Sequence, residues 1–256
     1  MRPKTDTLGD RMKAYEAVTR YILPRRTYTI LRVDGRAFHT WTKKLKRPYD
    51  KDFMICVDTA AIALCETISG SQFAFVQSDE ISLLATDFAD IKTQAWFDGV
   101  VQKWASVAAA IAAEAFNTKV AMYAFHKPDA VFDARVFTIP DHVEVENYFV
   151  WRQKDAVRNS VTMLAQAYAS HKQLHGKSIE ERHEIIHTAG DNWAKHPVGF
   201  IHGRVIRRAT GEDYGAPETT PKESNWIVDD KTPVFTKNRE YLQNLVPIAW
   251  DRKAGE

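Results

Sequence analysis

Two acidic residues stand where carboxylates could hold divalent metal ions. Asp34 follows an apolar segment and precedes Gly35, and Asp79 lies in a short polar insert between two apolar runs. Carboxylate oxygens suit Mg²⁺, which completes its coordination shell with water and phosphate. Two such ions would support in-line phosphoryl transfer from a nucleoside triphosphate without a side-chain nucleophile. Spacing alone favours the plainer interpretation, in which both residues are ordinary turn residues.

The segments around these carboxylates predict a sheet covered by helices. Periodicity predicts a strand over 28–33, a helix over 50–69, a hairpin over 72–85, a helix over 93–117 and a strand over 135–139. This order matches the split βαβ, ferredoxin-like arrangement, an α+β fold with helices on one face of an antiparallel sheet. The two carboxylates would then come from neighbouring strands. Four large residues at helical spacing are expected in the core: Met54, Trp96, Trp104 and Met163.

The chain beyond Pro140 predicts a second, mostly helical lobe. A helix is expected over 159–175, and a capping box at Ser178 opens another that ends near Gly190. The polar segment 211–232 is expected to be an exposed excursion. We therefore divide the chain into a catalytic domain, 1–140, and a C-terminal lobe, 141–256.

The bulk properties are those of a folded cytoplasmic protein. The chain has 256 residues, of which 45% are hydrophobic, and a formal net charge of +2, so the total charge demands no polyanionic partner. Cys56 and Cys65 lie on one predicted helix about 13 Å apart, too far for a disulfide, which indicates reduced thiols. No apolar run of about 18 residues predicts a membrane span.

Three sequence blocks together resemble the tRNA-histidine guanylyltransferase family and its guanylyltransferase-like relatives. They are Arg-Val-Asp-Gly-Arg-Ala-Phe-His over 32–39, Gln-Ser-Asp-Glu over 77–80 and Trp-Arg-Gln over 151–153. The start of the chain, 9–16, is also similar, and the match extends roughly over 9–208. The resemblance implies a palm like that of conventional polymerases. It also implies addition of nucleotides to a tRNA 5′ end in the 3′-to-5′ direction, with GTP and ATP as substrates.

The resemblance also implies roles for individual residues. Asp34 and Asp79 would be the catalytic residues and would ligate two Mg²⁺ ions with the backbone carbonyl of Gly35. The nucleotide-binding positions that it implies are Arg32, Asp34, Gly35, Arg36, Ala37, Phe38, His39, Arg47, Asp50, Ser78, Asp79, Glu80 and Asn159.

One block departs from the eukaryotic pattern. Where the eukaryotic enzymes carry His-Ile-Asn-Asn, this chain has Val157 in place of the histidine, and only Asn159 matches. Arg-Asn-Ser over 158–160 looks more like the bacterial and archaeal-type relatives, which prefer templated repair of a truncated tRNA 5′ end. Repair is therefore the expected activity, and addition of G to histidine tRNA is its alternative.

Basic residues of the second half are the candidate RNA contacts, because phosphates are neutralised by such groups. The alternative is a solvated basic face. The candidates are Arg152, Lys154, Arg158, Lys195, Arg204, Arg207 and Arg208. The resemblance also implies a homotetramer that holds one tRNA.

Two other functions compete with this interpretation. His183-Glu184-Ile-Ile-His187 has the H-E-x-x-H spacing of zinc metallopeptidases, and His196 or His202 could supply a third ligand. An ordinary packed histidine is favoured, since the capping box lies just before it. The other alternative is a non-catalytic RNA-binding module with a ferredoxin-like core, but such modules place aromatic residues where this chain has Asp34 and Asp79.

Overall fold

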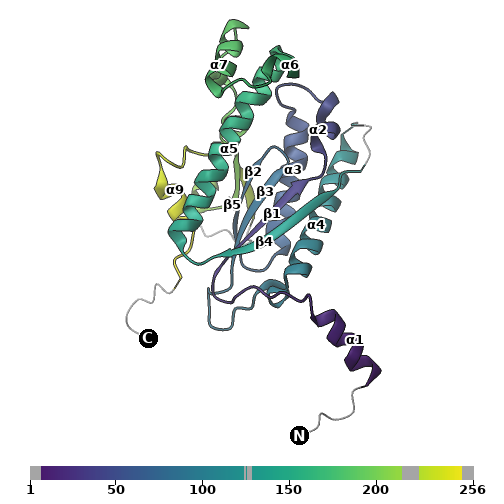
Figure 1. Cartoon of the computed structure of the whole chain (residues 1–256). Helices are drawn as coiled ribbons and strands as arrows, with labels where there is room; N and C mark the ends of the chain where they lie inside the picture. Colours follow the sequence, from purple (N-terminus) through teal and green to yellow (C-terminus); the bar gives the residue numbers. More distant parts are fainter. Residues whose placement is uncertain (1–6, 124, 126–128, 215–224, 250–256) are drawn as a thin grey trace.

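Six strands pair into one antiparallel sheet within the part of the chain that the computed structural model describes, which comprises residues 7–123, 125, 129–214 and 225–249. The strands are β1 (Tyr28–Gly35), β2 (Ser71–Gln77), β3 (Glu80–Thr86), β4 (Phe132–Ile139), β5 (Arg204–Arg208) and β6 (Trp226–Asp229). Their order across the sheet is β4-β1-β3-β2-β5-β6. The α+β fold is confirmed, and strands from both halves of the chain build the same sheet (Figure 1).

The central strand β1 places Asp34 between two neighbouring strands. In the antiparallel registers, Asp34 lies opposite Glu80 of β3 and opposite Asp133 of β4. Strands β2 and β3 form the predicted hairpin, and Ser78 and Asp79 are its turn. Ser78 has a positive φ of 49°, which the tight two-residue connection requires. The carboxylates therefore come from adjacent strands, as the sequence predicts.

Helices α3 (Lys51–Thr67) and α4 (Val101–Met122) cover one face of the sheet and bury one apolar core. The α3 helix begins where expected, because the Asp50 side chain caps its first turn. The predicted start of α4 at residue 93 is wrong: a 3₁₀ turn, η2 (Trp96–Gly99), comes first. Phe97 and Asp98 take left-handed φ values there, which interrupts the helix. Trp104 is buried, as expected.

Helix α5 (His142–Tyr168) crosses the opposite face of the sheet (Figure 1). The sequence predicted only its second half, because the buried face of the first half carries the polar residues Glu146, Arg152 and Gln153, which break the apolar periodicity. Asp141 caps the true start. The helix ends at Tyr168, and the predicted continuation to residue 175 is a separate short helix, α6 (His171–Leu174).

A small third cluster lies beyond the end of the sheet. Helix α7 (Ile179–Thr188), opened by the predicted capping box at Ser178, packs on the last turns of α5. The chain then returns through η3 (Trp193–Lys195) and α8 (Val198–Ile201) to β5. Gly203 makes this return possible, because its φ is +80° and a Cβ there would lie 2.4 Å from the Phe75 ring.

The remaining elements are short. They are α1 (Leu8–Ala17), which projects from the sheet in Figure 1, α2 (Phe38–Trp41), η1 (Thr42–Lys44), η4 (Gly211–Tyr214) and α9 (Arg239–Gln243). The expectation of an exposed excursion over 211–232 is wrong for Trp226–Asp229, which forms strand β6 on β5, while 215–224 lie outside the described residues. No helix among the described residues is long and apolar enough to cross a membrane.

Candidate active site

Asp34 and Asp79 face each other closely enough for their charges to interact. Burial raises the pKa of Asp79 to about 6, and the negative charge of Asp34 adds to this rise. The pKa of Asp34 is also raised, first by burial and then by Glu80 and Asp133. The fold therefore concentrates negative charge at the end of β1 and at the hairpin turn.

This excess of negative charge fits divalent cations. Among the described residues, no three His, Cys, Asp or Glu side chains gather as a complete metal site. An ion held by Asp34 and Asp79 would need further oxygen ligands, which water, phosphate and the Gly35 carbonyl can supply, as Mg²⁺ prefers. Gly35 is required for packing, because a Cβ there would lie 2.3 Å from the ring of Phe38.

The loop after Gly35 is anchored by an aromatic residue that the sequence assigned to the nucleotide. Phe38 is only 3% exposed and stacks on Trp41, with ring centroids 5.6 Å apart. Its side chain therefore packs in the core and does not line a nucleotide site, a correction to the prediction. Arg36, Ala37 and His39 beside it are exposed.

A basic pocket lies next to the carboxylates. Lys43, Lys46 and Arg47 line it together with Ser78 and Asp79. Of the three cations, the sequence analysis named only Arg47, although four of the five residues over 43–47 are Lys or Arg. That basic run was the available signal. The pocket offers positive charge to a polyphosphate whose other side meets the carboxylates.

Asp50, another predicted nucleotide ligand, is largely engaged with the backbone. One of its carboxylate oxygens accepts hydrogen bonds from the N–H groups of Asp52 and Phe53, at 3.0 and 3.2 Å, and the other accepts one from Lys46 N–H, at 3.2 Å. Asp50 therefore shapes the loop that carries the basic residues.

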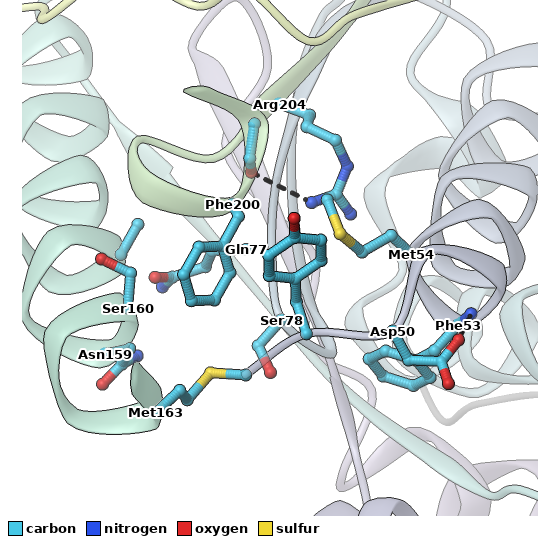
Figure 2. A pocket seen from close by; sticks show the side chains of 13 residues that line it. Asp50, Phe53, Met54, Gln77, Ser78, Asn159, Ser160, Met163, Phe200 and Arg204 are labelled. Carbon is cyan, nitrogen blue, oxygen red and sulfur yellow. Dashed lines mark hydrogen bonds between the residues drawn. The ribbon is translucent and has the colours of Figure 1, made fainter. Parts of the chain in front are cut away.

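A second pocket adjoins the first and lies between α3, α5 and α8 (Figure 2). The predicted nucleotide residue Asn159 is exposed at its edge on α5. Met54 and Met163 are half-buried and line this pocket, so their expected place in the core is wrong. Tyr49 and Phe200, which sequence analysis did not select, form an aromatic wall with ring centroids 4.8 Å apart.

The Trp-Arg-Gln block of α5 positions the catalytic hairpin. Arg152 is 4% exposed and donates two hydrogen bonds to Glu80, at 2.8 and 2.9 Å, and one to Asp155, at 2.7 Å. Arg32 lies 4.0 Å from the same Glu80 carboxylate. Glu80 is thus held beside Asp79 by a buried ion pair. The prediction that Arg152 contacts RNA is not consistent with this burial.

The other predicted RNA contacts divide into buried and exposed groups. Arg204 is 3% exposed and paired with Asp58 at 2.7 Å, so it too is inside the protein. Arg207 is half-buried and paired with Asp213 and Asp229. The exposed basic residues of this set are Lys154, Arg158, Lys195 and Arg208.

The H-E-x-x-H segment does not form a metal site. His183 packs against Trp193, with ring centroids 5.5 Å apart, and His187 is exposed. His196, proposed as a third ligand, instead pairs with Asp191 at 3.0 Å. Because the described residues contain no cluster that could hold a metal there, the zinc peptidase interpretation is rejected.

Comparisons with known proteins agree with the polymerase-like geometry. A family model described as tRNAHis guanylyltransferase matches residues 9–140. A bacterial tRNA(His) guanylyltransferase-like protein solved in complex with ATP is 39% identical, with a TM-score of 0.85 over 94% of this chain and 100% of that chain. A structure of such a bacterial protein with GTP is 35% identical, with a TM-score of 0.77 over 94% and 99%. The tRNA(His) guanylyltransferase of Schizosaccharomyces pombe is 25% identical over 93% of this chain and 90% of that protein.

Proposed function

The chain belongs to the tRNAHis guanylyltransferase family, and we propose that it adds nucleotides to a tRNA 5′ end in the 3′-to-5′ direction by Mg²⁺-dependent phosphoryl transfer. The observation that carries this proposal is the pair of coupled carboxylates, Asp34 and Asp79, beside a pocket lined by lysine and arginine. This arrangement suits a triphosphate bridged to protein carboxylates through metal ions.

In this proposal the protein contributes charge and position. Asp34, Asp79 and the Gly35 carbonyl would hold two Mg²⁺ ions, which would stabilise the attacking and leaving oxygens. Lys43, Lys46 and Arg47 would neutralise the triphosphate, and no side chain needs to act as a nucleophile.

The substrates follow from the relatives and from one sequence departure. The two bacterial structures contain ATP and GTP, so we propose that both nucleotides bind here, ATP to activate a 5′ monophosphate and GTP to be added. Val157 replaces the histidine of the eukaryotic pattern, which favours templated repair over addition of G to histidine tRNA. The exposed residues proposed to meet tRNA phosphates are Lys154, Arg158, Lys195 and Arg208.

Assembly and compartment complete the proposal. We propose a homotetramer that binds one tRNA, which a mass measurement in solution with and without tRNA would test. The buried free thiols of Cys56 and Cys65 support a reducing compartment, the cytoplasm.

The decisive experiment is incorporation of radiolabelled GTP onto a tRNA that lacks its first nucleotide. We expect label at the 5′ end with Mg²⁺ and none with EDTA, and a 5′-monophosphate tRNA should also require ATP. Asp79→Asn should abolish incorporation, whereas the exposed neighbour Asp133→Asn should retain it. Tight RNA binding without any incorporation would support the non-catalytic RNA-binding module instead, and label at the 3′ end would overturn the direction.

A further inference from the structure

Two buried polar atoms without partners belong to residues of the same pocket. Gln77 is 4% exposed and Arg204 is 3% exposed, and both line the pocket between α3, α5 and α8 (Figure 2). Within the described residues, Gln77 Oε1 and Arg204 Nη2 have no hydrogen-bond partner. Buried groups of this kind are rare in native proteins and call for an explanation such as a missing ligand.

The neighbouring contacts fix the orientation of both groups. Arg204 Nε donates to the Asp58 carboxylate at 2.7 Å, and Nη1 donates to the Gly199 carbonyl at 3.3 Å, which leaves Nη2 as the free donor. Gln77 Nε2 donates to Glu80 at 3.2 Å, so its amide oxygen is the free acceptor. The pocket thus presents one donor and one acceptor on groups that are already held in place.

The pocket walls suit a flat ring. Tyr49 and Phe200 contribute aromatic faces, and Met54 and Met163 contribute thioethers, which pack well against aromatic rings. The enclosed space is about 460 Å³, within the usual range of small-molecule sites. Tyr49 and Ser78 also line the basic pocket beside Asp79, so the two pockets adjoin.

We propose that this pocket binds a guanine base, with Arg204 Nη2 donating to O6 and Gln77 Oε1 accepting from the 2-amino group. The assignment to guanine rests on the proposed function. Adenine would place an amino group, itself a donor, against Arg204 and would leave Gln77 without a donor. A site built to hydrogen-bond a base discriminates strongly against an analogue that leaves its polar groups unpaired.

Nucleotide analogues test both hydrogen bonds in the unmodified protein. Dissociation constants would be measured with Mg²⁺ and without RNA for GTP, for ITP, which lacks the 2-amino group, and for 2-aminopurine riboside triphosphate, which lacks O6. Each analogue should bind about tenfold more weakly than GTP.

A matched pair of variants assigns the O6 contact. Asp58→Asn with Arg204→Met removes both buried charges together, and Asp58→Asn alone keeps the guanidinium. The double variant should bind GTP and the 2-aminopurine nucleotide equally while still preferring GTP over ITP. The single variant should keep both preferences, and circular dichroism would verify that both variants fold.

The guanine could belong to free GTP or to the RNA. A second arm therefore measures binding of tRNA whose 5′-terminal guanosine is replaced by inosine or 2-aminopurine riboside. Discrimination in either arm supports the pocket and identifies the source of the base, whereas equal binding of all bases in both arms overturns it. The GTP incorporation assay is read separately: incorporation without discrimination rejects only the pocket, and discrimination without incorporation rejects only the proposed reaction.

Discussion

Replacing Asp79 by Asn should stabilise the metal-free protein while removing its activity. The pKa of Asp79 is raised from 3.8 to about 6, because burial and the charge of Asp34 disfavour its ionised form in the folded state. A shift of about 2 pH units corresponds to about 3 kcal/mol of unfavourable free energy when the group is ionised. An amide at this position carries no charge, so it should recover up to about 3 kcal/mol.

The pH dependence gives this prediction its sign. The folded protein binds the Asp79 proton more tightly than the unfolded chain, so the penalty is complete above about pH 6 and is absent below about pH 4. Urea unfolding in EDTA should therefore show the Asp79→Asn variant more stable than the unmodified protein at about pH 7.5, with a difference that shrinks as the pH falls to about 4.

The matched control is Asp133→Asn, an exposed carboxylate on the neighbouring strand β4. This change should alter the free energy of unfolding by less than about 0.5 kcal/mol. Addition of Mg²⁺ and GTP should stabilise the unmodified protein and the control more than Asp79→Asn. An Asp79→Asn variant that is no more stable than the unmodified protein in EDTA at about pH 7.5 would refute the electrostatic reasoning.

Three further substitutions test other parts of the site. Arg152→Met leaves the Glu80 carboxylate buried without its guanidinium, so the free energy of unfolding should fall by about 3 kcal/mol in urea titrations, and Glu80→Gln in the same chain should restore part of it. Gly35→Ala introduces a Cβ against the Phe38 ring and should cost about 1–3 kcal/mol; an unchanged midpoint of thermal unfolding would contradict the packing argument. Lys46→Ala should weaken GTP binding about tenfold at low salt and less at high salt, and calorimetry that shows equal affinity would exclude this lysine from the triphosphate site.

The sequence was sufficient for the features that depend on neighbouring residues. Apolar alternation predicted the strand that ends at Asp34 and the hairpin that carries Asp79, because strand periodicity is local. The cap at Ser178 was predicted for the same reason, since a capping box spans only four residues.

The sequence was insufficient wherever a distant partner decides the role of a charged residue. Arg152 and Arg204 looked like surface cations, yet Glu80 and Asp58, 72 and 146 residues away in the chain, hold them in the interior. The first half of α5 was missed because its buried polar side chains find partners across the fold. Met54 and Met163 were assigned to the core because an apolar side chain that lines a pocket has the same sequence pattern as one that is fully enclosed.

The buried pair of Arg152 and Glu80 also limits how such a protein can change during evolution. Loss of either partner alone strands a charge in the interior beside the metal-binding aspartates, whereas simultaneous loss of both removes the penalty. Drift through single substitutions should therefore be blocked at these two positions. Among descendants of this chain, the two residues should be inherited as a unit, either retained together or replaced together.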